Sequence, residues 1–220
     1  MTHQTKNHPY FEAEMVLTSK HQKLDLIAPP LSERLAIKVR EIALDTDQLG
    51  TFSGELPRTL SQFDTAVAKA RMGIEQSGSP LGLASEGSIG SDPALPFINS
   101  DLELVVLVDA ERGIVISEYF RSFAITAAKL TYKAGDDLRA FLIRADFPRH
   151  GLIVSAKSAN DVLFLKGISD ARALDSALAQ SLNFSEHGDV VIESDLRAIH
   201  SPSRRENIRS AAVALAARIN

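Results

Sequence analysis

The chain has 220 residues, of which 45% are hydrophobic and 24% charged, a balance typical of a globular protein with a sizeable core. Its 24 Lys and Arg against 28 Asp and Glu give a formal net charge of -4, which provides no reason to expect duplex nucleic acid or an anionic membrane as a partner. The absence of cysteine excludes disulfides and thiolate chemistry and fits a cytoplasmic location. We find no apolar run of the roughly 18–20 residues that a membrane span requires.

The first quarter of the chain predicts a strand followed by short helices. Residues 1–9 have no apolar core and are expected to form a flexible lead-in. Residues 10–18 predict a strand, and a short helix should follow it and stop at Pro29-Pro30, because prolines lack the N–H that continues a helix. A second short helix is expected from Ser32, followed by a strand at about 36–42.

The clearest helix is predicted over residues 61–76. Apolar residues recur there at helical spacing, Thr59 or Ser61 can cap the start, and the segment beginning at Ser77 ends it. A short apolar strand at 81–84 should then run into the polar segment Ser85-Glu86-Gly87.

The second half alternates strands and helices. We expect a hairpin at 102–109 and 113–119, helices at 136–146 and about 170–182, strands at 151–155, 161–166 and 189–193, and a final helix capped by Ser201, whereas 122–131 is ambiguous between strand and helix. This order predicts an α/β fold with a mixed central sheet flanked by helices. Residues 10–220 are expected to form a single domain, with a soft boundary near 131–136 that leaves open two lobes around a cleft.

Polar clusters follow several of these strands, where ligands bind in open α/β sheets. The first contains Lys20 and Lys23, together with two hydroxyls, in a strand-to-helix turn. Lysines, hydroxyls and backbone N–H groups are what a phosphate requires. The alternative is a capped helix with solvent-exposed lysines.

An acidic loop forms the second cluster. Asp45, Asp47 and Glu55 are candidate Mg²⁺ ligands, because Mg²⁺ takes carboxylates and keeps several waters, and Arg58 beside them is a candidate phosphate ligand. A solvated polar loop whose aspartates form turns is the competing interpretation.

Glu86 is the third candidate, as a metal ligand or general base at the end of a strand, with Gly87 allowing close backbone approach. A strand-terminal turn is the alternative explanation of the same residues. His150 is the histidine best placed for proton transfer near neutral pH, although lone histidines are more often structural.

Cations in the second half are candidate phosphate ligands. Lys166 ends a strand, and Arg197 and Arg204 follow the last strand and open the last helix. An ion-pair network that positions the final helix is the alternative for the arginines.

Six segments together resemble an uncharacterised bacterial family of unknown function: Thr18–Lys23, Asp45–Glu55, Ala68–Arg71, Gly82–Gly87, Phe147–Gly151 and Glu193–Arg205. More distantly, the order of strand, Thr/Ser-x-x-x-Lys turn, acidic loop, Ala-rich helix and strand ending in Glu-Gly resembles the inosine/xanthosine triphosphate pyrophosphatase superfamily. That resemblance implies phosphate binding by Lys20 and Lys23, a metal-linked role for Glu86, and Mg²⁺ that activates water. The chain departs from the pattern at His21, where asparagine is usual.

We therefore expect an Mg²⁺-dependent hydrolase of a nucleotide or related phosphorylated small molecule. The alternative from another class is a non-catalytic nucleotide- or anion-binding regulatory module. A metal-dependent nuclease has only the arginines at the start of the last helix in its favour, and the net negative charge is against it. Exposed strand edges in a mixed sheet favour a homodimer as a generic expectation.

Overall fold

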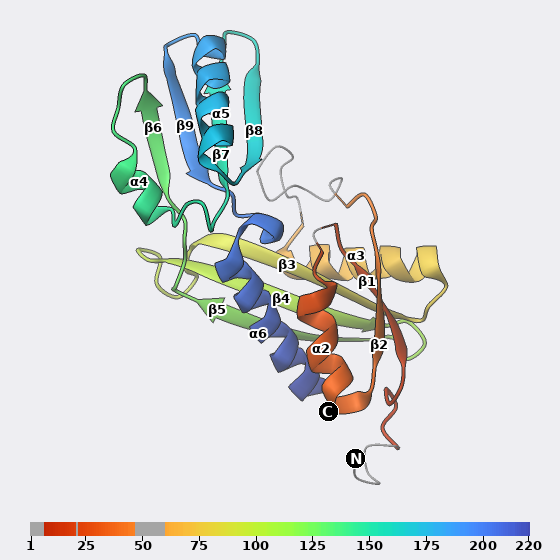
Figure 1. Cartoon of the computed structure of the whole chain (residues 1–220). Coiled ribbons are helices and arrows are strands. Elements are labelled where there is room, and N and C mark those ends of the chain that lie inside the picture. The colour runs from red at the N-terminus through yellow and green to blue at the C-terminus, as the bar shows by residue number, and fades with distance from the viewer. Residues whose placement is uncertain (1–6, 21, 47–59) are drawn as a thin grey trace. The chain divides into compact units, whose positions relative to one another are not determined.

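The computed structural model describes residues 7–20, 22–46 and 60–220. The chain forms two compact units (Figure 1). Unit 1 contains residues 1–125 and 204–220, and unit 2 contains residues 126–203. Each unit has its own sheet and its own helices, and each is described by itself.

Unit 1 is built on a mixed five-stranded sheet in the order β2-β1-β3-β4-β5. Its strands are β1 (Glu14–Thr18), β2 (Lys38–Ile42), β3 (Leu81–Ser91), β4 (Asn99–Asp109) and β5 (Ile114–Ser122). β1 pairs in parallel with both β2 and β3, while β3, β4 and β5 form an antiparallel meander. The parallel strand β1 is the shorter partner, and its pairing with β3 ends at Thr18 and Ala84.

Helices cover both faces of this sheet. They are α2 (Leu24–Leu35), α3 (Gln62–Ser77) and α6 (Pro202–Ile219). Side chains of a strand alternate between faces, and the glycines of β3 identify what lies on each. A Cβ at Gly82 would meet Ala70 and Ile74 of α3, whereas a Cβ at Gly87, five positions later, would meet Arg204 of α6. Therefore α3 packs on one face of the sheet and α6 on the other (Figure 1).

The core of unit 1 has two layers because both faces of the sheet are covered. On the α3 face, Ala66, Val67 and Ala70 pack against Leu104 and Val106 of β4. The remaining helices contribute side chains that are at most 6% exposed; they are Leu26, Ile27, Leu31 and Leu35 of α2 and Ile208, Ala212, Leu215 and Ile219 of α6. The named side chains of α6 belong to its buried face.

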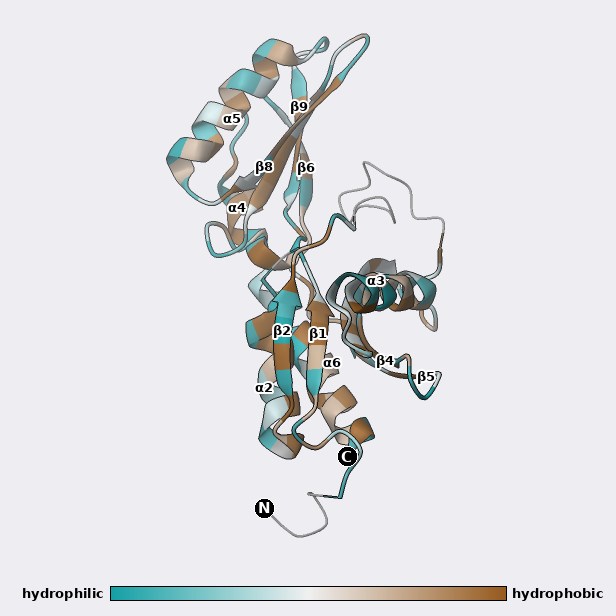
Figure 2. Ribbon diagram, turned by 90° about the vertical axis from the view of Figure 1, so that its right-hand side faces the viewer, coloured by the Kyte–Doolittle hydropathy of each residue, from teal (hydrophilic) through white to brown (hydrophobic). Residues whose placement is uncertain are grey.

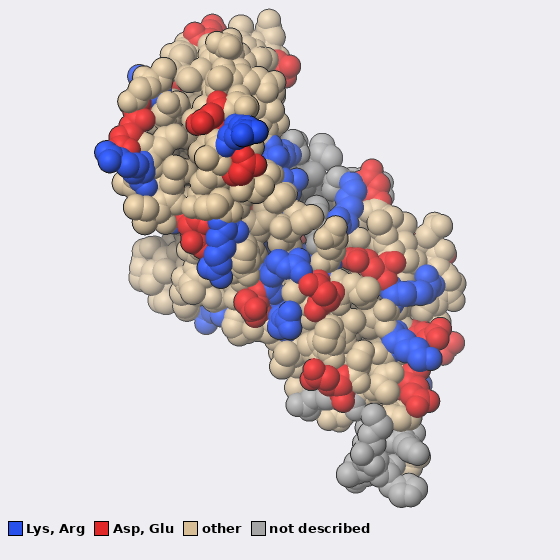
Figure 3. Space-filling model, viewed as in Figure 1, with Lys and Arg blue, Asp and Glu red and all other residues tan. Residues whose placement is uncertain are grey.

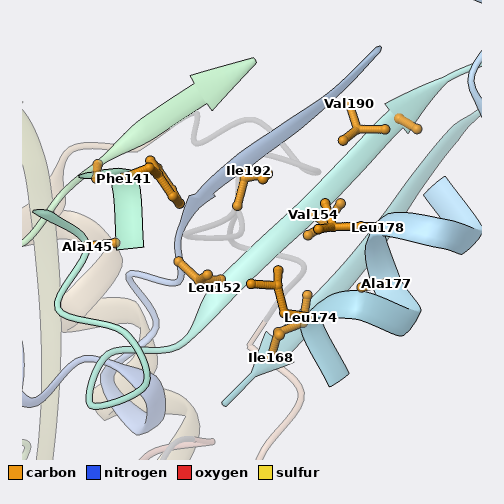
Figure 4. Packing of buried hydrophobic residues seen from close by; sticks show 12 residues of the cluster. Phe141, Ala145, Leu152, Val154, Ile168, Leu174, Ala177, Leu178, Val190 and Ile192 are labelled. Carbon is orange, nitrogen blue, oxygen red and sulfur yellow. The ribbon is translucent and has the colours of Figure 1, made fainter. Parts of the chain in front are cut away.

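Unit 2 is a four-stranded antiparallel sheet in the order β6-β9-β7-β8. Its elements are β6 (Lys129–Lys133), α4 (Arg139–Arg144), β7 (Leu152–Lys157), β8 (Val162–Ile168), α5 (Ala171–Phe184), β9 (Asp189–Ser194) and the 3-10 turn η2 (Ala198–His200). Leu174, Ala177 and Leu178 of α5 pack with Leu152 and Val154 of β7 (Figure 4). The helix is amphipathic along its length, with hydrophobic and hydrophilic residues alternating over its turns (Figure 2).

The α/β class with a mixed, helix-flanked sheet is confirmed, and so is the β4–β5 hairpin. The predicted cap Ser61 is also present, because its Oγ accepts from Asp64 N at the start of α3. At the start of α5, Asp170 Oδ1 accepts from Ala173 N in the same way. The ambiguous stretch 122–131 contributes the end of β5 and the start of β6. The single-domain expectation for residues 10–220, with its soft boundary near 131–136, stays a prediction.

The expected stop at Pro29-Pro30 is wrong. Both prolines lie inside α2, which continues to Leu35 and leaves no separate helix starting at Ser32. A proline in a helix interior costs about 3 kcal/mol, but burying a Leu or Ile side chain contributes about 1.5–3 kcal/mol. The buried aliphatic side chains of α2 flank the prolines, and their packing offsets that cost.

The strand expected at 81–84 is longer in the structure than predicted. β3 runs to Ser91 because β4 pairs with it along its whole length, so Glu86 stands inside a strand, opposite Leu104. Within the described part of the chain, no helix has both the length and the apolar character needed to cross a bilayer.

Replacing Gly82 by alanine should destabilise unit 1. The added Cβ would lie 2.5 Å from the backbone oxygen of Ala70, so α3 must shift away from β3. We expect a loss of about 1–3 kcal/mol in the free energy of unfolding, measured by urea titration. Gly90→Ala on the same strand is the matched control, because nothing lies within 4 Å of its new Cβ. Equal losses in both variants would contradict this packing.

Candidate functional site

Polar side chains gather in unit 1 at the carboxyl end of β1. β1 stops at Thr18, where it is paired with Ala84 of β3. β3 continues beyond this point with Ser85 and Glu86. Lys23 stands there at the N-cap of α2. Ser85 and Glu86 are buried, each with 4% of its surface exposed, and Lys23 has 8% of its surface exposed. The region of the sheet where ligands were expected is therefore filled with buried polar and charged groups.

On the α3 face, the carboxylate of Glu86 forms an ion pair with Lys69. The start of α3 is held to the same place by Gln62, whose Nε2 donates to the backbone oxygens of Glu86, at 2.9 Å, and Leu102, at 2.8 Å. Residues 62 and 69 are two helical turns apart, so both reach the same stretch of sheet. The Glu86 carboxylate is therefore held on the α3 face by the Lys69 ammonium group.

On the opposite face, Lys23 Nζ donates to Ser85 Oγ over 2.9 Å. Burial first, and then the charge of the nearby Arg204 guanidinium, lowers the pKa of Lys23 to about 8, although the carboxylates of Glu103 and Glu86 raise it. Groups on both faces of the sheet act on Lys23 because the β1 strand that would separate them has ended. Lys23 is thus a buried amine poised near neutral pH.

The α6 face also holds a pair of carboxyl groups on β4. Asp101 and Glu103 are two residues apart and share one side of the strand. Arg204 Nε lies 2.5 Å from Glu103 Oε1, and Asn207 Nδ2 donates to Asp101 Oδ2 over 2.7 Å. These contacts hold the α6 helix on β4.

Burial raises the pKa of Asp101 to about 7, and the charge of Glu103 raises it in the same direction. With both groups ionised, Asp101 Oδ1 and Glu103 Oε2 have no donor among the described residues. A proton on Asp101 that is donated to Glu103 satisfies both oxygens. We therefore describe Asp101 and Glu103 as a carboxyl pair that shares one proton.

The sequence suggested that glycine at position 87 allows a ligand to approach the backbone, but the structure gives another reason for this glycine. A Cβ at this position would lie 2.2 Å from Arg204 Nη2 and 2.6 Å from both carboxylate oxygens of Glu103. The missing side chain leaves the space in which the Arg204–Glu103 pair lies. We call the buried groups Lys23, Glu86, Asp101, Glu103 and Arg204, together with Lys69, the ionic cluster.

The other predicted residues of unit 1 are less buried or lie outside the described residues. Lys20 Nζ lies 2.8 Å from Asp45 Oδ1, so a predicted phosphate ligand and a predicted metal ligand form one surface ion pair. Asp47, Glu55 and Arg58 lie outside the described residues. Basic and acidic side chains are interspersed among the described residues on the face shown in Figure 3, and the concentrated charge of unit 1 is internal.

The three remaining predicted residues belong to unit 2. His150 has ring contacts to Asp146 and Ser203. Arg197 forms a bidentate pair with Asp195; burial raises the pKa of that carboxyl, but the hydrogen bonds and charge of Arg197 outweigh it and hold the pKa below its usual range. Lys166 Nζ lies 5.6 Å from the centre of the Phe164 ring.

The described residues do not supply a complete magnesium site. No group of three or more His, Asp or Glu side chains among them has the arrangement to hold a metal ion. Glu86 lies with Lys69, and Asp45 lies with Lys20. The metal role of Asp47 and Glu55 stays a prediction because neither is described.

A cavity of about 440 Å³ lies at the start of α2. Its lining consists of Gln22, Leu24, Asp25, Ala28, Pro29, Glu41 and Arg205. This lining offers a phosphate only one cation beside two carboxylates, whereas the ionic cluster contains Lys23, Lys69 and Arg204. Glu41 Oε1 accepts from Lys23 N over 3.1 Å, so a carboxylate already occupies the N-terminus of α2.

Sequence reasoning missed Lys69, Asp101 and Glu103. Lys69 resembles any lysine of a solvated helix face, because only the pairing of α3 with β3 directs it toward Glu86. Asp101 and Glu103 did leave a signal: they are two positions apart and lead directly into the apolar run of residues 104–108 in the same strand. Charged side chains at such positions must find partners when the strand is buried.

The fold and this cluster define a two-unit α/β protein in which one unit encloses an ionic cluster at the carboxyl end of a parallel strand. The chain belongs to the family described as Domain of unknown function (DUF6671), whose sequence profile matches residues 69–220. The expected membership of an uncharacterised domain family is thus confirmed. No curated protein matches the chain.

The shared proton predicts a pH dependence of stability. Because the pKa of Asp101 is raised from 3.8 to about 7 by folding, the native chain binds more protons than the unfolded chain between these values. The free energy of unfolding should therefore fall as pH rises through that window, by up to about 1.4 kcal/mol per pH unit. Asp101→Asn, whose amide can donate to Glu103 at any pH, should remove this slope in urea titrations.

Glu111→Gln is the control, because Glu111 lies in the exposed turn between β4 and β5. It removes one carboxyl from the same unit and should leave the slope intact. An unchanged slope in Asp101→Asn would show that the carboxyl pair does not carry the extra proton.

Proposed function

We propose that unit 1 binds a nucleotide or related phosphorylated small molecule at the carboxyl end of β1. The observation that carries the proposal is the ionic cluster, in which Lys23, Lys69 and Arg204 come from three different helices to one end of one strand. Burying charges costs several kcal/mol per ion after relaxation, and well-packed apolar residues often stabilise a fold as well or better. Such clusters are therefore more frequent at functional sites than elsewhere.

Phosphate is the ligand chemistry that fits these groups best. Lys20, beside the cluster in sequence, has 35% of its side chain exposed and can meet a ligand from solvent. Lysine and arginine bind phosphate oxygens through charge-assisted hydrogen bonds. A bound phosphate would also compete with Asp45 for Lys20, which is an exchange between two anions of similar chemistry.

Hydrolysis of that ligand with Mg²⁺ is the second candidate function. The observation in its favour is the fixed carboxylate of Glu86, held by Lys69 close to the end of β1. Mg²⁺ needs only one or two protein carboxylates when phosphate oxygens and waters complete its shell.

Lys20→Met should weaken nucleotide binding about tenfold. The probe is ATP or inosine triphosphate, titrated calorimetrically with and without Mg²⁺, and the loss corresponds to about 1.4 kcal/mol. Lys38→Met is the matched control, because Lys38 is an exposed lysine at the opposite end of β2. Binding that is absent in the parent chain, or equal losses in the two variants, would overturn the proposal.

Product analysis separates the two candidate functions. Release of phosphate or pyrophosphate from the same nucleotides, abolished by Glu86→Gln, would establish the hydrolase. Glutamine keeps the side-chain length and one oxygen for Lys69, and circular dichroism checks that the variant is folded. Binding with no product from any nucleotide would establish the non-catalytic module.

A further inference from the structure

Three side chains of unit 2 form a chain of hydrogen bonds through a histidine. His150 Nδ1 lies 2.9 Å from Asp146 Oδ2, and His150 Nε2 lies 3.1 Å from Ser203 Oγ. The imidazole is 2% exposed, whereas 45% of the Asp146 side chain is exposed and Ser203 is half-buried. The histidine is therefore enclosed between a carboxylate and a hydroxyl that solvent can reach.

The backbone around His150 holds this arrangement in place. Asp146 follows α4 with a φ of 49°, a conformation that non-glycine residues adopt rarely, and its backbone oxygen accepts from His150 N over 2.9 Å. On the other side, Gly151 N donates to His200 O over 2.9 Å, and Gly151 O accepts from Asp195 N over 2.7 Å. The loop that carries the histidine is thus bonded at both ends.

The bonds assign the protons. The carboxylate of Asp146 can only accept, so Nδ1 carries the imidazole proton and Nε2 is left to accept from the Ser203 hydroxyl. Ser203 N also points toward Nε2, at 3.4 Å. A nucleophile bonded to a base that is itself oriented by a third group is the geometry of covalent catalysis.

We propose that Ser203, His150 and Asp146 form a Ser–His–Asp triad that hydrolyses small carboxylic esters, an activity separate from phosphate binding in unit 1. Ser203 Oγ attacks the ester carbonyl carbon while its proton passes to His150 Nε2. The ester C–O bond then breaks, and His150 returns the proton to the leaving alkoxide. Water attacks the acyl-serine by the same proton route, which releases the carboxylic acid and restores the hydroxyl.

The ester class follows from what surrounds the serine. Ser203 is the second residue of α6, a helix of 18 residues, and the N-terminal end of a helix favours developing negative charge. Attack on a neutral carbonyl creates such a charge on oxygen, and this chemistry needs no metal. The triad thus contains a nucleophile, a base and an orienting carboxylate within one compact unit.

The full chain should react with a fluorophosphonate reagent at Ser203. In this reaction Ser203 Oγ bonds to phosphorus, fluoride leaves, and His150 takes the proton, so the adduct is located by peptide mass spectrometry. The chain should also release p-nitrophenolate from p-nitrophenyl acetate. Ser203→Ala should abolish both signals, and Asp146→Asn should slow labelling at least about 100-fold.

Ser158→Ala is the control, since Ser158 lies in an exposed turn of the same unit between β7 and β8. Thermal melts establish that each variant is folded, and Asp146→Asn, at a partly exposed position, serves if His150→Gln does not fold. Absence of a Ser203 adduct on the parent chain would overturn the triad. Equal labelling rates in the parent and in a folded His150→Gln or Asp146→Asn variant would also overturn it, because an unactivated serine has then reacted.

Discussion

Unit 1 depends on a buried ion pair between Arg204 and Glu103. Both side chains are almost entirely shielded from water, so their mutual charge is what makes their burial tolerable. Removing one partner from such a pair leaves the other as an uncompensated buried charge. The pair also fixes where α6 begins its contact with β4, and Gly87 provides the space for it. The charge on Arg204 then acts on the pKa values of Lys23 and Asp101.

The end of β1 explains why these charges influence one another. In the middle of a sheet, backbone and side chains of a continuous strand separate the two faces. Past Thr18 that separation is missing, and Lys23 on one face responds to Glu86 and Lys69 on the other. A ligand that enters there meets charges from both faces at once, which is why we place the proposed phosphate site at this point.

In unit 2, both packing and hydrogen bonds hold the backbone around His150. The ring of His200 occupies the space next to Gly151 and Gly167, where a Cβ at either position would lie 2.9 Å from it. The backbone at both glycines is also bonded to buried Asp195, whose Oδ2 accepts from Gly167 N and whose N donates to Gly151 O. His150 lies four positions from Asp146 in the chain but 53 positions from Ser203. The proposed triad therefore exists only in the folded unit.

Local patterns in the sequence determined much of the fold. The period of the apolar residues predicted α3, α5, α6 and the β4–β5 hairpin, and short-range hydrogen bonding predicted the cap Ser61. These features depend on neighbours within a few positions. The same local reasoning ended α2 at its prolines, because the buried contacts that offset their cost come from the rest of unit 1.

The sequence by itself determined that Lys23, Glu86, His150 and Arg204 are candidates for chemistry, since their side-chain types and positions beside strands were enough. Only the tertiary structure decided their partners: Ser85 for Lys23, Lys69 for Glu86, Asp146 and Ser203 for His150, and Glu103 for Arg204. The reason is that burial and charge pairing depend on which strands and helices pack together. A charged residue has the same appearance in a sequence whether it faces water or an opposite charge within a core.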